Sequence, residues 1–270
     1  MTLITFAFNK SAIYVATDTQ LTYIGDRTIA EQAIKSNFFQ CKDGKFLVGY
    51  TGNNVYITDE LHLADWITDR LSGNNIATTE IASIIATIKS GLEEAYYYRR
   101  APFEPLTIVA VGWVRVGDKT ELVGIRITNC EAEDASSLSP SRAFKVFKDE
   151  LRRDALVRGS IRLKVYPAFD NKLKHIRSLL KSYQGDKIAL SLYELNSEAR
   201  ANPEWRPLIG EDVVISCILR DENRVRHWQY PLSEDYLVPN SNTGNLSLRG
   251  VRVTGDSSNG SLYMNFRIGE

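Results

Sequence analysis

Four residues in the first part of the chain have the types and spacing that acyl-transfer chemistry requires: Thr2, Asp18, Lys35 and Gly52. A hydroxyl nucleophile needs a base to take its proton and a donor to stabilise the developing oxyanion. A threonine at a chain end has its own base, because an α-amine has an ordinary pKa of about 7.7–8.0. Removal of Met1 would therefore turn Thr2 into a nucleophile with a built-in base.

The other three residues can each assist such a nucleophile. A lysine ammonium near the amine, here Lys35, disfavours protonation of the amine and eases proton removal from the hydroxyl. Asp18 would keep Lys35 charged and oriented. The turn expected at residues 51–53 could bring a backbone N–H close to the reacting carbonyl, because Gly52 lets the main chain approach closely. The predicted catalytic set is therefore Thr2, Asp18, Lys35 and Gly52.

This stretch resembles the proteasome β-subunit family, which includes the bacterial heat-shock-locus V peptidase. The matching pieces are Thr2 in second position, the segment 16–22 (ATDTQLT), Lys35, and the glycine-flanked segment 49–52 ahead of a helix. Asp18 follows Thr2 at the family's interval, whereas Lys35 lies one residue further along than is usual. The resemblance covers the first part of the chain by motif and most of the chain by element order.

The resemblance implies an α+β fold, namely a four-layer αββα sandwich of two antiparallel sheets. It also implies assembly into homo-oligomers and hydrolysis of peptide bonds in peptides or unfolded proteins by the N-terminal threonine. One feature of the family has no clear match between residues 130 and 200: a glycine- and serine-rich turn, with the Asp and Ser that support the amine.

Two alternatives to a peptidase stay open. Asp18 and Lys35 can form a structural ion pair in a catalytically inactive assembly or binding protein of the same fold, because a buried pair does not require catalysis. The missing support for the amine favours this alternative. The same N-terminal chemistry would also serve an amidase that acts on a small amide.

Composition excludes several other classes of protein. The 270 residues include 33 basic and 33 acidic ones, and zero net charge argues against nucleic acid or an anionic membrane as the main partner. The sequence contains neither a long apolar run nor a secretory signal, so we expect a cytoplasmic protein. Its cysteines and histidines are scattered, so we expect no metal and no cofactor. It contains no GxxxxGK[ST] loop, so any use of ATP would need an ATPase partner.

Hydrophobic periodicity predicts strands, two helices, strands, helices and strands, in that order. Because four strands come before any helix, their pairing should be antiparallel. The predicted strands are 2–8, 12–17, 35–40, 45–50, 106–116, 121–128, 212–220 and 223–230. The predicted helices are one from about 55 to 71 and one beginning after Thr79, followed by helical or mixed segments at 141–157, 171–183 and 187–200, with a further strand at 160–166.

The chain divides by composition into a main domain, residues 1–230, and a C-terminal extension, residues 231–270. The extension is rich in Ser, Asn and Gly and ends in alternating apolar residues, which predict a β-hairpin that must bury its apolar face on the main body or on a neighbouring subunit. Segment 142–181 is strongly basic. We interpret it as a solvated helix face, with an acidic partner or nucleic acid as the alternative.

Overall fold

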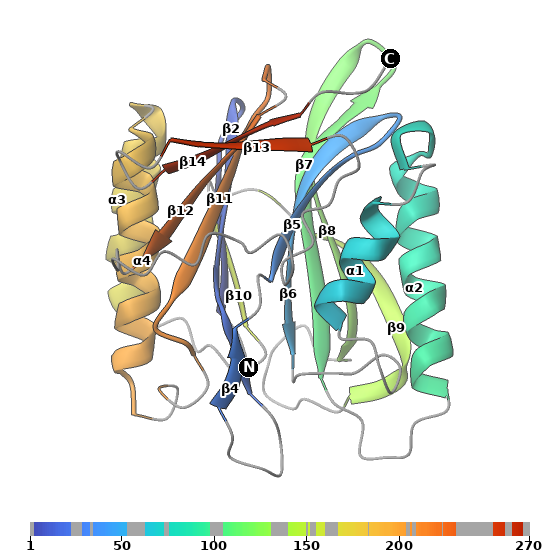
Figure 1. Cartoon of the computed structure of the whole chain (residues 1–270), viewed down its shortest axis with the longest axis horizontal. Coiled ribbons are helices and arrows are strands. Elements are labelled where there is room, and N and C mark those ends of the chain that lie inside the picture. Colours follow the sequence, from blue (N-terminus) through green and yellow to red (C-terminus); the bar gives the residue numbers. More distant parts are fainter. Residues whose placement is uncertain are drawn as a thin grey trace.

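The computed structural model consists of two stacked antiparallel sheets with helices on both outer faces (Figure 1). This arrangement is the expected αββα sandwich, so the predicted fold class is confirmed. The structure describes residues 3–22, 29–32, 35–52, 63–72, 76–97, 105–130, 140–149, 151, 155–159, 167–182, 184–203, 206, 209–222, 224–230, 251–256 and 261–266.

The larger sheet has seven strands in the order β10-β1-β2-β11-β12-β14-β13, and every neighbouring pair is antiparallel. β1 and β2 form the predicted N-terminal hairpin, and β13 and β14 form the predicted C-terminal hairpin. The strands are β1 (Leu3–Phe8), β2 (Ala12–Asp18), β10 (Ala155–Gly159), β11 (Val213–Leu219), β12 (Arg224–Tyr230), β13 (Val251–Asp256) and β14 (Ser261–Phe266). The division of the chain at residue 230 stays a prediction.

The smaller sheet has five strands in the order β5-β6-β7-β8-β9, again all antiparallel. Gly117, with φ of 60°, makes the turn between its two longest strands. A separate two-stranded ribbon pairs β3 (Gln20–Thr22) with β4 (Ile29–Gln32). The five strands are β5 (Ser36–Gln40), β6 (Gly44–Gly52), β7 (Leu106–Val116), β8 (Lys119–Cys130) and β9 (Pro140–Asp149).

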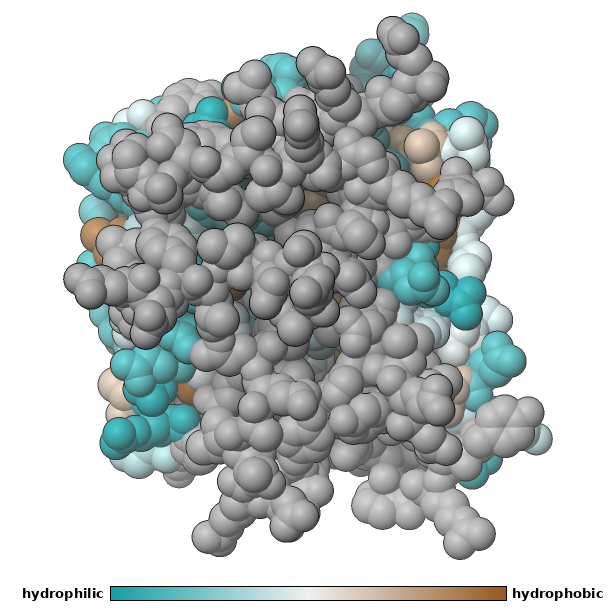
Figure 2. Space-filling model, in the orientation of Figure 1, coloured by the Kyte–Doolittle hydropathy of each residue, from teal (hydrophilic) through white to brown (hydrophobic). Residues whose placement is uncertain are grey.

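Each sheet is covered on its outer face by two helices (Figure 1). Helices α1 (Leu63–Ser72) and α2 (Ile81–Tyr97) pack on the five-stranded sheet, with a short 3-10 turn at Ile76–Thr78 between them. Helices α3 (Pro167–Lys181) and α4 (Gly185–Ala201) pack on the seven-stranded sheet. On the flanks in Figure 2, the described surface is mainly hydrophilic, as expected for amphipathic helices with one buried face. None of the described helices is long and apolar enough to cross a membrane.

A third apolar core fills the space between the two sheets, because side chains alternate between the two faces of a strand. Its buried members from the larger sheet include Ile4, Phe6, Phe8, Ile13 and Val15, and those from the smaller sheet include Phe38, Leu47, Val109, Val111 and Trp113. At Gly49 on β6, a Cβ atom would lie 2.9 Å from Ile4 Cγ2. The two sheets therefore approach so closely here that a side chain would have to displace its neighbour.

Segment 141–157 was predicted to be helical or mixed, but its residues 141–149 and 155–157 belong to the strands β9 and β10, so this prediction was wrong. Both are edge strands, and the described side chains of β9 other than Phe144 are partly or fully exposed, which gives a weak hydrophobic pattern. On β9, Phe144 is buried against Tyr96 of α2, with ring centroids 5.1 Å apart, while Val146 is 44% exposed. The strand predicted at 160–166 and the first part of the helix predicted from about 55 lie outside the described residues.

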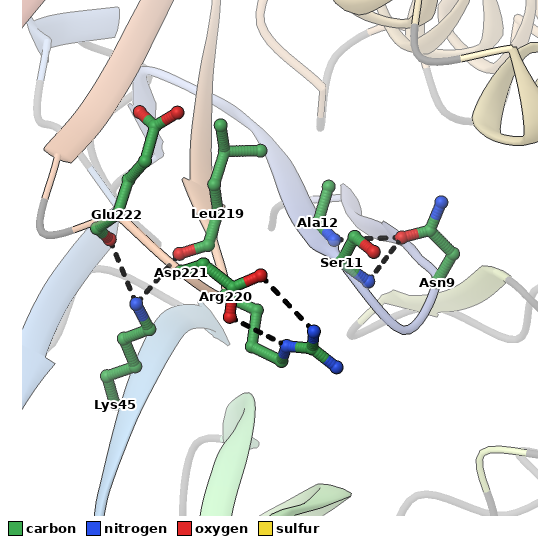
Figure 3. A network of polar contacts seen from close by, with 8 residues as sticks. All are labelled: Asn9, Ser11, Ala12, Lys45, Leu219, Arg220, Asp221 and Glu222. Atoms are coloured by element: carbon green, nitrogen blue, oxygen red, sulfur yellow. Dashed lines mark hydrogen bonds and ion pairs between the residues drawn. The ribbon is translucent and has the colours of Figure 1, made fainter.

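Lys45 of β6 ties the two sheets together at one end of the sandwich (Figure 3). Its Nζ donates hydrogen bonds to the carbonyl oxygens of Leu219, at 2.8 Å, and Glu222, at 2.9 Å, in the turn between β11 and β12. In the same turn, the Arg220 N–H donates to the Ser11 carbonyl at 2.8 Å and so joins the β1–β2 turn to it. Burial lowers the pKa of Lys45, which is consistent with a structural cation withdrawn from water.

We predict that Lys45→Met lowers the free energy of unfolding by about 1–3 kcal/mol, because two partly buried carbonyls lose a charged donor. Urea denaturation monitored by circular dichroism measures the change. The matched control is Lys42→Met, whose ion pair with Glu80 is more than half exposed on both sides (58% and 57%), and it should leave the midpoint unchanged. Equal effects of the two substitutions would contradict the proposed role of Lys45.

Candidate active site

Asp18 and Lys35 form an ion pair in the interior of the protein, where both side chains are almost inaccessible to solvent (0% and 3% exposed). Lys35 Nζ lies 2.9 Å from Asp18 Oδ1. The other carboxylate oxygen, Oδ2, accepts a hydrogen bond from the backbone N–H of Leu3 at 3.3 Å. One carboxylate therefore joins the lysine to the beginning of β1.

Backbone hydrogen bonds hold both members of the pair. Asp18 is the last residue of β2, and the N–H of the following Thr19 donates to the Asp212 carbonyl just before β11, at 3.0 Å. Lys35 directly precedes β5, and its own carbonyl accepts the N–H of Tyr50 on β6, at 3.1 Å. The two charged side chains thus extend from backbone positions that are fixed within the two sheets.

Burial lowers the pKa of Lys35, and the neighbouring Asp18 charge opposes that shift. A lysine whose pKa is lowered gives up its proton more readily than a surface lysine does, which is a property of groups that act in proton transfer. The same burial makes the pair costly unless both partners are present. The pair is therefore suited to chemistry, and it also contributes to the integrity of the fold.

The structure brings together two of the four residues predicted from the sequence, Asp18 and Lys35. Thr2 lies outside the described residues, and Leu3, its neighbour in sequence, contacts the Asp18 carboxylate. Gly52 is the last residue of β6 and pairs with Leu106 of β7, so the strand continues into the turn expected at 51–53. The catalytic roles of these residues stay predictions.

No family model and no curated protein sequence matches this chain. Among solved structures, it is similar to Anbu (ancestral beta-subunit) from Yersinia bercovieri, with a TM-score of 0.52 and 15% sequence identity over 80% of this chain and 81% of the other. The chain has the fold of the ancestral proteasome β-subunit. A Gly-1 mutant of Anbu from Hyphomicrobium sp. strain MC1 is similar too, with a TM-score of 0.51 and 13% identity over 87% and 89% of the two chains. At these identities the likeness to Anbu concerns the fold.

Next to the ion pair, this Anbu-like fold contains a polar layer that sequence reasoning missed. It consists of Thr17, Ser36, Ser216 and His227. The Oγ atoms of Ser36 on β5 and Ser216 on β11 lie 3.3 Å apart, and Ser216 Oγ lies 2.9 Å from His227 Nδ1 on β12. Ser216 is the only hydroxyl-bearing residue of β11 (VVISCIL), and that break in an apolar strand is the signal that could have revealed it.

Two polar atoms of this layer, Thr17 Oγ1 and His227 Nε2, are buried and have no hydrogen-bonding partner among the residues that the structure describes. Burial lowers the pKa of His227 to about 4, so its imidazole is neutral at physiological pH. Among the described residues, no cluster of His, Cys, Asp and Glu side chains could hold a metal ion. The layer thus consists of neutral hydrogen-bonding groups beside a charged pair.

We predict that Asp18→Asn destabilises the protein by about 3–5 kcal/mol, because it leaves the buried Lys35 ammonium without its counter-charge. Adding Lys35→Met should recover part of this loss, since the double variant has neither charge. Urea denaturation of the single and double variants measures the coupling. Asp118→Asn, in the exposed turn between β7 and β8, is the control and should have no effect. Additive effects of the two site substitutions would contradict a coupled pair.

We also predict that His227 makes the stability depend on pH. The unfolded imidazole has an ordinary pKa of about 6.5, whereas the folded pKa is about 4, so the unfolded state binds a proton more readily between these values. Stability present above pH 6.5 should therefore fall as the pH falls towards 4, by up to about 3 kcal/mol from this group.

Urea denaturation at pH 7 and pH 5 tests this prediction. His227→Asn should reduce the pH dependence, while His175→Asn, which replaces an exposed histidine on α3, should not. If wild type and His227→Asn lose stability equally between the two pH values, His227 is not the responsible group.

Proposed function

We propose that the chain is a proteasome-like hydrolase that cleaves peptide bonds with Thr2 as its nucleophile, after removal of Met1. The observation that carries the proposal is the hydrogen bond from the Leu3 N–H to Asp18, at 3.3 Å. Leu3 is joined to Thr2 by a single peptide bond. The buried carboxylate and its lysine therefore act on the segment that would bear the nucleophile.

In the proposed reaction, Thr2 Oγ attacks the carbonyl carbon of the substrate while its proton passes to the α-amine of Thr2. The ammonium of Lys35 stabilises the negative charge that develops on Oγ, and Asp18 keeps Lys35 in place. A backbone N–H near Gly52 stabilises the oxyanion. The amine then delivers its proton to the departing nitrogen, and water hydrolyses the acyl-enzyme and restores Thr2.

Strand geometry supports this assignment. On β1, Ile4, Phe6 and Phe8 belong to the core between the two sheets, whereas Leu3 and Ala7 pack towards the helices. Alternate residues of a strand face the same side, and Thr2 comes two residues before Ile4, so we expect the Thr2 side chain on the inner side of the sheet. Ser36 and Ser216 are on that inner side too, which makes the region beside the ion pair polar.

The proposed substrates are peptides or unfolded proteins, and the active protein would be a homo-oligomer, as the resemblance to the proteasome family implies. Delivery of a folded substrate would need an ATPase partner, because the sequence has no phosphate-binding GxxxxGK[ST] loop.

The second candidate is a catalytically inactive assembly or binding protein with this fold. Two observations favour it. The Asp18 carboxylate is bound on both oxygens by the protein's own groups. The larger sheet also ends in β13, an edge strand through which another chain could pair.

Mass spectrometry and activity assays together separate the two candidates. We predict that the intact mass of the purified protein lacks one methionine, and that a panel of fluorogenic peptides includes a substrate. Thr2→Ala should lower hydrolysis by about 10³-fold or more, because it removes the nucleophile, and Thr2→Ser should retain part of the activity.

The control is Thr120→Ala, an exposed threonine on β8, which should be as active as wild type. Retention of Met1 in the purified protein, or equal hydrolysis by wild type and Thr2→Ala, would rule out the peptidase and favour the inactive candidate.

A further inference from the structure

The residues that flank the ion pair in sequence belong to the polar layer between the sheets. Thr17 precedes Asp18 on β2, and its side chain is completely buried. Ser36 follows Lys35 and is the first residue of β5. The two backbone segments that carry the charged residues therefore continue directly into this layer.

Ser36 contacts the opposite sheet through its hydroxyl group. β5 is an edge strand of the five-stranded sheet and has a strand neighbour, β6, on one side only. The Ser36 Oγ to Ser216 Oγ contact of 3.3 Å joins the beginning of β5 to β11 of the seven-stranded sheet. Ser216 in turn contacts His227 Nδ1 at 2.9 Å, on the next strand of that sheet.

We propose that Ser216 and His227 are positioning residues, which act through Ser36 to hold Lys35 at the distance from Thr2 that proton transfer requires; this inference rests on the proposed function. The hydroxyl groups of Ser36 and Ser216 can each donate one hydrogen bond and accept up to two. Loss of Ser36 or Ser216 removes the hydroxyl contact between β5 and the larger sheet, and loss of His227 removes the partner that orients the Ser216 hydroxyl. Neither Ser216 nor His227 touches the reacting atoms in this scheme.

The need for such an anchor follows from the chemistry of a lysine side chain. Four methylene groups joined by rotatable bonds separate the Lys35 ammonium from its backbone. A small backbone displacement therefore changes which groups Nζ can reach. A misplacement of about 1 Å can cost about 100-fold in rate. An edge strand is less constrained than a central one, and a buried hydrogen bond to the opposite sheet is a direct way to fix its end.

Histidine suits this position because the residue stays neutral there. A charged imidazole would add a second cation to the hydrogen-bonded groups that lead to Ser36, the residue next to Lys35 in sequence. The neutral imidazole instead presents a planar ring whose Nδ1 is directed at Ser216 Oγ. Asparagine can present a hydrogen-bonding atom in nearly the same place as Nδ1, whereas leucine fills the space without one.

The pKa of Lys35 depends on the surroundings of its ammonium group, and it can be measured whether or not the protein is catalytically active. NMR spectroscopy of protein labelled at lysine Cε gives the titration midpoint of Lys35, identified from the signal that disappears in Lys35→Arg. In Ser216→Ala we expect this midpoint to rise towards the ordinary lysine value by about half a unit or more, because a loosened ammonium gains water. Ser191→Ala, a buried serine on α4 away from the layer, should leave it unchanged.

The substitutions at His227 make the test specific. His227→Leu should shift the midpoint as Ser216→Ala does, and His227→Asn should restore it. In the active protein, the same two disruptive variants should lower kcat by about tenfold or more with little change in KM, as expected for misplacement of a group that acts in the transition state.

An unchanged Lys35 midpoint in folded Ser216→Ala and His227→Leu would overturn the inference, even if the protein is a peptidase. A shifted midpoint in a protein without peptidase activity would uphold the positioning of Lys35 and reject the proposed function alone. Should Ser216→Ala fail to fold, Ser36→Ala and His227→Leu provide the same readings. Failure of all three to fold would also overturn the inference, because the layer would then support the fold as a whole.

Discussion

The attraction between Asp18 and Lys35 is the interaction on which the interior depends. Transfer of a carboxylate or an ammonium out of water costs several kcal/mol per ion, and the cost is recovered only when the partners are well aligned and their remaining sites are bonded. Here the carboxylate meets the ammonium at 2.9 Å with one oxygen and the Leu3 N–H with the other. The beginning of β1, the end of β2 and the beginning of β5 therefore have to keep fixed positions relative to one another.

Two lysines join the sheets at opposite ends of the sandwich, and their surroundings give them different chemistry. Lys45 donates to backbone carbonyls near one end, where β11 pairs Leu219 with Ala12 of β2. Lys35 meets a carboxylate near the other end, where β11 pairs Val213 with Asp18. Backbone carbonyl oxygens hold the Lys45 ammonium in place, but they are much weaker bases than a carboxylate and do not take part in proton transfer. The Asp18 carboxylate orients the Lys35 ammonium and also binds the Leu3 N–H, next to Thr2 in sequence. In the proposed function this places a positive charge close to the nucleophile.

The sequence was informative wherever burial imposed a regular pattern. Helix α2 buries one face and shows a helical period, whereas the strands at 106–116 and 213–219 are buried on both faces and show nearly continuous apolar runs. The spacing of Asp18 and Lys35 predicted a contact that the structure contains. The edge strand β9 was missed because, among its described side chains, Phe144 alone is buried.

The polar layer was missed for a different reason. Ser216 and His227 face each other across the β11–β12 pair, but Ser36 is distant from both in the sequence, and only the stacking of the two sheets brings it to them. Hydrogen bonds between residues on three different strands leave no periodic signal in a single chain. The contact of Leu3 with Asp18 was equally invisible, because it involves a backbone N–H that any residue would offer.

The position of β1 in the larger sheet has a consequence for biosynthesis. The strand lies between β2 and β10, and its register with β10 runs from Leu3–Gly159 to Ala7–Ala155. At about 5–20 residues per second, a ribosome needs about 8–30 seconds to reach that partner. During this interval one side of the first strand has nothing to pair with, and an aminopeptidase has access to the nascent chain's first bond. The trimming that the proposed chemistry needs is therefore compatible with a fold that later encloses the same strand from both sides.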